Sequence, residues 1–333
     1  MRVMPILEES LQNPRLLIEK KSPALWPSEG GIFVERDGRR YRIGGCNRKA
    51  YYRLKDFPKD RIGRSVGSQL TLDLGHLIQD WLTNVIKGAR VYLGDEVPIQ
   101  IKRTTVNGNS YLISGSIDII VQDPDTGRPI FCEIKSVGLW KAMAGLCQSS
   151  TAGKFAPTED HVIQVMPYLD VARTEFGVQD PECHIIYICR DKPNLIGEHV
   201  VQIGANGQAV ITNDIGVTSW DDVNLQALYA DYDQQADMAA RDQVPEMPFT
   251  TQYSDKDLVW LAEHGMLNQT ETKVVKANLK NGSSPLLRKG DFACHQLYCD
   301  FFNTCHDTGI AAPDGVRLPR PVEEQPEADI GLV

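Results

Sequence analysis

The chain has 333 residues, of which 42% are hydrophobic and 24% charged, so its composition is that of a folded protein and not of a disordered one. It contains no run of about 18 apolar residues, which excludes a transmembrane helix, and its N-terminal sequence lacks the apolar core of a secretory peptide. We therefore expect a cytoplasmic protein whose eight cysteines are thiols or metal ligands and not disulfides.

One segment of the chain is strongly basic, although the net charge of the whole chain is −9. Between Arg36 and Arg64, eleven residues are Lys or Arg and only three are acidic. Aromatic residues alternate with these cations, which suits phosphate contact and base stacking. A solvated face on an otherwise acidic protein is the alternative interpretation. The candidate DNA-binding residues are Arg48, Lys49, Tyr51, Tyr52 and Arg53.

Turn and periodicity signals predict the elements in chain order. Asp37-Gly38 predicts a hairpin turn within 31–43, and a helix follows over 46–54. A long helix is predicted over 66–87, with its apolar face formed by Leu70, Leu74, Leu77, Ile78, Trp81, Leu82 and Val85. Strands are predicted at 91–102, 110–122, 130–136, 184–189 and 198–203, and further helices at 159–176, 220–242 and 255–264.

The order of these elements predicts a mixed α/β sheet with a mostly helical region beside it. Residues 141–158 have no clear period and are expected to form a mobile loop. We expect four regions: an N-terminal region over 1–64, a core over 65–215, a helical region over 216–311 and a disordered acidic tail over 312–333.

Two neighbouring strands carry carboxylates and a lysine. Side chains alternate along a strand, so Glu133 and Lys135 share one face, and Asp118 falls almost opposite Ile134 across the hairpin. Two carboxylates and a backbone carbonyl form an oxygen site suited to Mg²⁺ or Mn²⁺. Because an unpaired carboxylate in an apolar strand is costly, the residues leave two interpretations open: a metal site, or a buried ion pair with Lys135.

Gly115-Ser116-Ile117-Asp118 and Glu133-Ile134-Lys135 resemble motifs II and III of the RecB-family PD-(D/E)xK nucleases. Two more elements are similar: a histidine on the preceding helix, His76, and a Gln-x-x-x-Tyr motif at Gln164–Tyr168. The resemblance implies a restriction-endonuclease-like mixed sheet flanked by helices. It also implies that His76, Asp118, Glu133 and the Ile134 carbonyl bind Mg²⁺ or Mn²⁺. By the same resemblance Lys135 activates or orients water, and Gln164 and Tyr168 hold the lysine or the DNA near the metal.

Three cysteines, Cys294, Cys299 and Cys305, lie within twelve residues near the end of the chain. Such spacing suits a metal site, with a fourth ligand in Cys46, and His295 or His306 could replace one thiolate. The iron–sulfur subgroup of RecB-family nucleases, which includes AddB-like and CRISPR-associated RecB-like exonucleases and phage relatives, carries one cysteine before the core and three after it. This resemblance implies a [4Fe–4S] cluster held by Cys46, Cys294, Cys299 and Cys305, with Zn²⁺ as the alternative.

The remaining cysteines have ordinary explanations. Cys132, Cys183 and Cys189 lie in or beside apolar strands and are expected in the core, and Cys147 is expected to be a free thiol in the mobile loop.

The resemblance implies a metal-dependent DNA exonuclease acting on single-stranded DNA or DNA ends in a bacterial, archaeal or phage-infected host cell. It would act in recombination, repair, phage replication or CRISPR adaptation, with a helicase, recombinase or CRISPR integrase as a possible partner and no membrane. Two alternatives stay open: a non-catalytic DNA-binding scaffold subunit of a helicase or recombination complex, and a zinc-stapled endonuclease.

Overall fold

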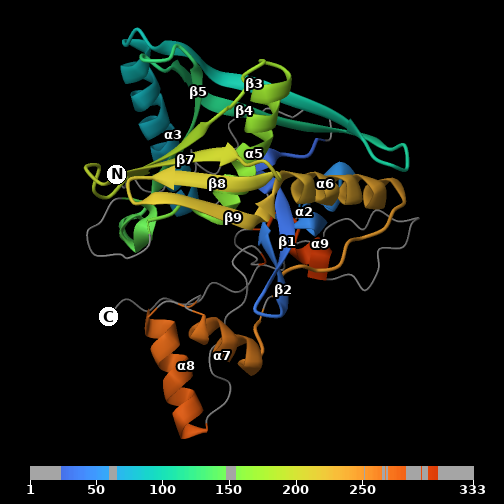
Figure 1. Ribbon diagram of the computed structural model, residues 1–333. Helices are drawn as coiled ribbons and strands as arrows, with labels where there is room; N and C mark the ends of the chain where they lie inside the picture. The colour runs from blue at the N-terminus through green and yellow to red at the C-terminus, as the bar shows by residue number, and fades with distance from the viewer. Residues whose placement is uncertain are drawn as a thin grey trace, which may run out of the picture. The chain divides into compact units, whose positions relative to one another are not determined.

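The computed structural model describes residues 24–59, 66–147, 155–250, 252–264, 267, 269–282, 294 and 299–306 (Figure 1). The chain divides into two compact units, one of Met1–Lys55 with Gly63–Pro248 and the other of Asp56–Ile62 with Phe249–Val333. The predicted tail over 312–333 lies outside the described residues. None of the described helices is both long and apolar enough to cross a membrane.

The first unit opens with a 3-10 turn, η1 (Pro27–Glu29), and a two-stranded hairpin of β1 (Gly31–Arg36) and β2 (Arg39–Gly44). Asp37 and Gly38 both have positive φ, as a two-residue hairpin turn requires, so the predicted turn is confirmed. Helix α2 (Asn47–Leu54) follows, with Cys46 at its N-cap position. On β2, the buried Arg42 guanidinium donates to both carboxylate oxygens of Asp231 at 2.7 and 2.8 Å, which anchors the hairpin to the unit.

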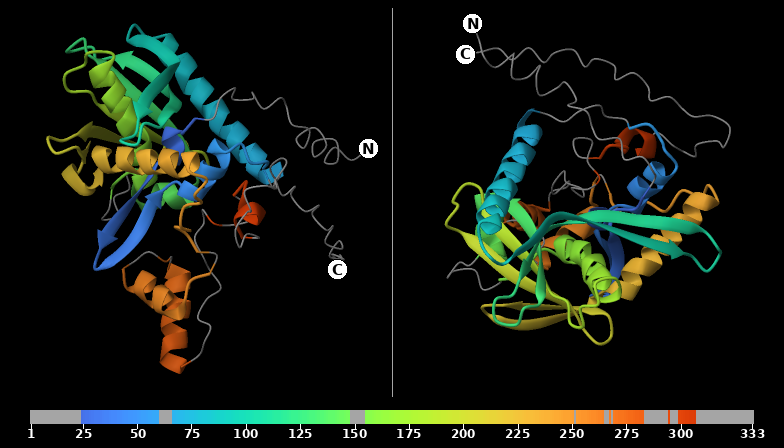
Figure 2. Two further views of the ribbon diagram at one scale, coloured as in Figure 1. Left: turned by 90° about the vertical axis from the view of Figure 1, so that its right-hand side faces the viewer. Right: turned by 90° about the horizontal axis from the view of Figure 1, so that it is seen from above.

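A seven-stranded mixed sheet forms the centre of this unit, in the order β3-β4-β5-β6-β7-β8-β9 (Figures 1 and 2). Adjacent strands of the sheet are antiparallel except for β5 and β6, which run parallel. The predicted mixed α/β architecture is therefore confirmed. The strands are β3 (Tyr92–Thr104), β4 (Ser110–Gln122), β5 (Pro129–Val137), β6 (Cys183–Cys189), β7 (Ile196–Ile203), β8 (Gln208–Asn213) and β9 (Gly216–Asn224).

Helices α3 (Val66–Lys87) and α5 (Glu159–Thr174) cover opposite faces of the sheet (Figure 2). On α3, Ile78, Leu82 and Ile86 pack against the face that includes Cys132 and Ile134. Helix α5 packs its apolar residues on the other face, in the larger core that includes Phe131 and Ile185. Because side chains alternate along β5, Glu133 and Lys135 point to the α5 side.

The predicted helix over 66–87 is confirmed as α3, but only part of its apolar stripe is covered. Ile78 and Leu82 contact the sheet as expected. The other five residues of that prediction are between 41% and 63% exposed in this structure: Leu70, Leu74, Leu77, Trp81 and Val85. Periodicity alone marks a wide apolar stripe, and only the position of the sheet decides which edge of the stripe is covered.

Two segments differ from the predicted elements. Residues 220–224 belong to strand β9, so helix α6 (Leu225–Ala240) begins five residues later than predicted, with Asn224 as its N-cap. The expected boundary at 215/216 therefore falls inside the β8–β9 hairpin. Within the predicted mobile loop, residues up to Leu146 form helical turns, α4 (Leu139–Lys141) and the π-helix η2 (Ala142–Leu146), and Cys147 is buried.

The second unit contains α7 (Asp255–Glu263), α8 (Gln269–Asn281) and α9 (Phe302–His306). Helix α7 begins at the predicted N-cap: Ser254 accepts from the Asp257 amide, and the Asp257 carboxylate accepts from the Ser254 amide. A small core forms between α7 and α8 from Leu258, Ala262, Leu267 and Val275. Helix α8 had no counterpart in the prediction.

Candidate active site

The site begins where the β4–β5 ladder ends. The last backbone pair before the strands separate is Ile119 with Cys132. At the next residue the Asp118 carboxylate replaces the missing ladder bond, because its Oδ2 accepts from the backbone N–H of Ile134 at 2.7 Å. The expected proximity of Asp118 and Ile134 is thus confirmed, and it depends on a local opening of the sheet.

The same opening exposes a backbone oxygen. In an extended strand the N–H and C=O of one residue point to the same side. Since the Ile134 N–H points to Asp118, the Ile134 carbonyl also points into the gap between β4 and β5. This geometry is the one that a carbonyl ligand beside Asp118 would need.

A hydrogen-bond network joins Glu133, Lys135, Gln164 and Tyr168. The Lys135 ammonium lies 2.5 Å from Glu133 Oε1 and donates to Gln164 Oε1 at 3.0 Å. The Gln164 amide nitrogen donates to Glu133 Oε1 at 2.6 Å and to the Tyr168 hydroxyl at 3.1 Å. Gln164 and Tyr168 share one face of α5, as their spacing predicted. Together with Pro167, which lies inside the helix, they are buried against the sheet.

Burial dominates the electrostatics of this network. It raises the pKa of Asp118 to about 8, with the Glu133 charge as the second cause, against the opposing effects of the Ile134 amide and Lys135. Burial also raises the pKa of Glu133, although Lys135 opposes it. For Lys135, burial alone would lower the pKa, but the neighbouring Glu133 carboxylate outweighs it and the pKa is raised.

One oxygen of this network has no hydrogen-bond partner among the described residues. Glu133 is 2% exposed, and its Oε1 accepts two hydrogen bonds while its Oε2 accepts none. A buried carboxylate oxygen without a hydrogen-bond partner destabilises the folded state. Together with the Ile134 carbonyl and the Asp118 carboxylate, this Glu133 oxygen forms a set of hard oxygen donors whose chemistry suits a divalent cation.

His76 lies on α3, whose close approach to the sheet depends on a glycine. A Cβ placed on Gly75 would lie 3.0 Å from Ser136 Oγ on β5, so the serine hydroxyl would have to move by a few tenths of an ångström to make room for it. The imidazole of His76 is exposed. Within the residues that the structure describes, no three His, Cys, Asp or Glu side chains are grouped closely enough to hold a metal ion. The role of His76 as a ligand remains a prediction.

The C-terminal cysteines belong to the second unit and Cys46 to the first. Cys294 Sγ lies 3.2 Å from His306 Nε2, and Cys305 is buried on α9. No disulfide joins any of the eight cysteines, all of which lie in the described ranges. The proposed ligand set of Cys46, Cys294, Cys299 and Cys305 stays a prediction, and His295 lies outside the described residues.

Several residues of the basic segment are buried or contact other parts of the protein. Tyr51 and Tyr52 are 4% and 1% exposed, with their rings packed edge to face, so the expected base stacking by these two residues is wrong. Arg53 pairs with Glu29 and lies over the Trp26 ring, and Lys49 reaches the same carboxylate at 3.1 Å. Arg48 donates to the Pro245 carbonyl at 2.6 Å. DNA contact by Arg48, Lys49 and Arg53 remains a prediction.

Two residues beside the site were missed in the sequence. His161 Nδ1 lies 2.7 Å from the Tyr187 hydroxyl, and Tyr187 is opposite Lys135 on the neighbouring parallel strand. Burial lowers the pKa of His161 to about 4, which keeps the ring neutral at pH 7. Its position three residues before Gln164, on one face of the same helix, was the signal that could have identified it.

Comparison with known proteins adds little to this description. No protein-family model matches the chain, and no curated protein matches it. Among solved structures, the chain titled "Crystal structure of SSO0001" is similar, with 16% sequence identity and a TM-score of 0.40. The similarity covers 80% of this chain and 96% of that chain. A likeness of this degree carries no argument about the site or its function.

Proposed function

We propose that this protein is a divalent-metal-dependent nuclease that hydrolyses phosphodiester bonds in DNA. One observation carries the proposal: at the open end of the β4–β5 ladder, Asp118 accepts from the Ile134 N–H, and the neighbouring Glu133, paired with Lys135 through Oε1, has a buried Oε2 with no hydrogen-bond partner among the described residues. Oxygen donors of this kind suit Mg²⁺ or Mn²⁺. The restriction-endonuclease-like form of the sheet and the resemblance to RecB-family nucleases belong to the same proposal.

Each residue has a role in this hydrolysis. Asp118, Glu133, the Ile134 carbonyl and His76 would hold the ion, which supplies positive charge to the phosphate and lowers the pKa of a bound water. Lys135 is partly exposed and is placed to orient the attacking water or to offset the negative charge that develops on the phosphate. Water adds to phosphorus, the ester P–O bond breaks, and the leaving oxygen takes up a proton.

Gln164 keeps Lys135 in position. Its amide accepts from the Lys135 ammonium and donates to Glu133, so both ends of the ion pair are fixed to α5. Without it the lysine could turn toward solvent through its exposed side. Tyr168 in turn accepts from Gln164 and fixes the orientation of its amide.

The substrate follows from the resemblance. We propose exonuclease action on single-stranded DNA or DNA ends, in recombination, repair, phage replication or CRISPR adaptation. A helicase, recombinase or CRISPR integrase would supply the substrate. A non-catalytic scaffold subunit is the competing proposal.

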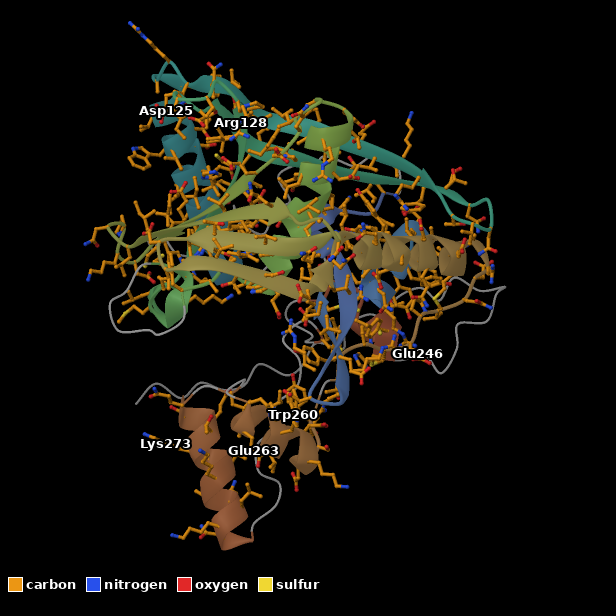
Figure 3. The ribbon with its side chains drawn as sticks, viewed as in Figure 1. Asp125, Arg128, Glu246, Trp260, Glu263 and Lys273 are labelled. Atoms are coloured by element: carbon orange, nitrogen blue, oxygen red, sulfur yellow. The ribbon has the colours of Figure 1, made fainter. Side chains whose placement is uncertain are left out.

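The test compares degradation of single- and double-stranded DNA, labelled at one end, by the wild type and by Asp118→Ala and Lys135→Met, with Mn²⁺ or Mg²⁺. Asp125→Ala is the matched control, because Asp125 lies with Arg128 in the exposed turn of the same β4–β5 hairpin (Figure 3). We expect metal-dependent shortening that both site variants lose and the control retains. Intact DNA with folded wild type would contradict the proposal and favour a scaffold. Equal activity in Asp118→Ala would contradict it in another way, by showing that the cleavage does not depend on this site.

We also propose a [4Fe–4S] cluster held by Cys46, Cys294, Cys299 and Cys305. The proximity of Cys294 and His306 keeps a zinc site as the alternative, because Zn²⁺ accepts mixed thiolate and imidazole ligands. Iron, sulfide and zinc contents of anaerobically purified protein distinguish the two. Iron and sulfide lost in both Cys46→Ser and Cys299→Ser support the cluster. Zinc retained in Cys46→Ser but lost in His306→Ala contradicts it.

A further inference from the structure

Glu96 has an unusual backbone conformation in the middle of β3. Its φ is +48°, whereas the other described non-glycine residues with positive φ are three aspartates in turns or just after helices. A residue with a Cβ rarely adopts this conformation, and glutamate is less suited to it than aspartate or asparagine. The register pairs Asp95 with Ile119 and Val97 with Ile117, which leaves Glu96 opposite Asp118.

The Glu96 carboxylate joins two elements of the site. Its Oε1 accepts from the Gln79 side chain on α3 at 2.8 Å, and its Oε2 accepts from Ser116 Oγ on β4 at 3.1 Å. Gln79 is three residues after His76, and Ser116 is two residues before Asp118. One carboxylate therefore ties the helix that carries His76 to the strand that carries Asp118.

The charge of Glu96 also acts on the site itself. It raises the pKa of both Asp118 and Glu133, so the three carboxylates are within electrostatic range of one another. Glu96 lies opposite Asp118 and adds negative charge at this end of the sheet, where its own backbone is held in a strained conformation. The buried Glu133 Oε2 has no hydrogen-bond partner within the described residues, which points to a cation as the missing component.

We propose that Glu96 is a positioning residue of the metal site, which fixes α3 against β4 so that His76 can join Asp118 and Glu133 around one divalent cation. This inference rests on the proposed nuclease function. It adds a residue that would not touch the DNA or the reacting phosphate. Its effect should therefore appear in metal affinity and not in the rate of the metal-saturated enzyme.

The test is Mn²⁺ titration of the full-length protein, followed by electron paramagnetic resonance and by DNA cleavage. The variants are Glu96→Gln, Glu96→Gly and Gln79→Ala, with Asp95→Asn as the matched control. Asp95 also ties α3 to β3, by its contact with Lys87, but at the end of the helix and away from His76. The control therefore removes a neighbouring carboxylate and a helix contact of the same kind.

We expect each site variant to raise the Mn²⁺ concentration for half-saturation about tenfold or more, the usual effect of removing a residue that orients a metal ligand. The control should match the wild type, as should the cleavage rate of every variant at saturating Mn²⁺. Glu96→Gly should lower the melting temperature no more than Glu96→Gln, because glycine relieves the strain at positive φ. A lower melting temperature with unchanged half-saturation would show a merely structural residue and overturn the inference.

The two proposals fail in different ways. If the wild type neither binds Mn²⁺ through Asp118 nor cleaves DNA, the nuclease proposal fails and the role of Glu96 fails with it. If the wild type does both, and the Glu96 and Gln79 variants show wild-type half-saturation, only the role of Glu96 is overturned.

Discussion

Replacing Asp118 with asparagine should make the metal-free protein more stable at pH 8 while it abolishes metal-dependent cleavage. Burial and the Glu133 charge raise the pKa of Asp118 from its ordinary value of 3.8 to about 8. Between these two pH values the folded protein keeps a proton that the unfolded chain has lost. The unfolded state then binds fewer protons, so the free energy of unfolding falls as pH rises. The neutral amide of the Asp118→Asn variant avoids this loss, and its oxygen can still accept from Ile134.

The size of the effect follows from the same pKa. A rise from 3.8 to about 8 corresponds to at most about 5–6 kcal/mol of unfolding free energy at pH 8 and above. Asp118 is only partly buried, and water on its open side screens the charge. We therefore expect a difference of about 1–3 kcal/mol between variant and wild type at pH 8, and a much smaller one at pH 5.

The assay is chemical unfolding at pH 5 and pH 8, in chelator and in Mn²⁺. In chelator the variant should be the more stable protein at pH 8. In Mn²⁺ the order should reverse, because an ion at about 1,000 times its dissociation constant adds about 4.1 kcal/mol to the protein that binds it. Asp125→Asn, in the exposed turn, should follow the wild type throughout. A variant no more stable than wild type at pH 8 in chelator, or equally stabilised by Mn²⁺, would refute the reasoning.

Three further predictions test how the site is supported. Gly75→Ala alone should gain little stability because its Cβ would press on Ser136, but in a Ser136→Ala background it should gain about 1 kcal/mol of helix propensity; an equal gain in both backgrounds, measured by chemical unfolding, would contradict the close approach. Arg42→Met should lower the free energy of unfolding by about 3–5 kcal/mol, because it leaves the buried Asp231 carboxylate without its cation, and adding Asp231→Leu should recover most of this loss. No recovery in the double variant would argue against this account. Tyr52→Ala should lower the free energy of unfolding by about 3–5 kcal/mol, because it removes a buried aromatic ring. If the variant instead kept the wild-type melting temperature and bound DNA more weakly in fluorescence anisotropy, the stacking role would be supported again.

Several parts of the fold could be predicted because their signals are local. Asp37-Gly38 encodes a two-residue turn by its tolerance of positive φ, and Ser254 with Asp257 encodes the start of α7. The β4 and β5 strands were recognisable from apolar runs on either side of a turn. Residues 220–224 misled the prediction because a polar edge strand and the first turn of a helix look alike in sequence. Only pairing with β8 makes that segment a strand.

The candidate site also has some features that follow from local sequence and others that depend on tertiary contacts. By itself the sequence determined that Asp118, Glu133 and Lys135 lie on neighbouring strands and that Gln164 and Tyr168 share a helix face, because strand and helix periods relate residues close in the chain. Only the tertiary structure decided that the ladder opens at Asp118, that Gln164 bridges Lys135 and Glu133, and that Glu96 faces Asp118. The burial of Tyr51 and Tyr52 was likewise evident only from the tertiary structure. These features depend on contacts between segments far apart in the chain, and no local preference of a residue specifies which distant segment will cover it.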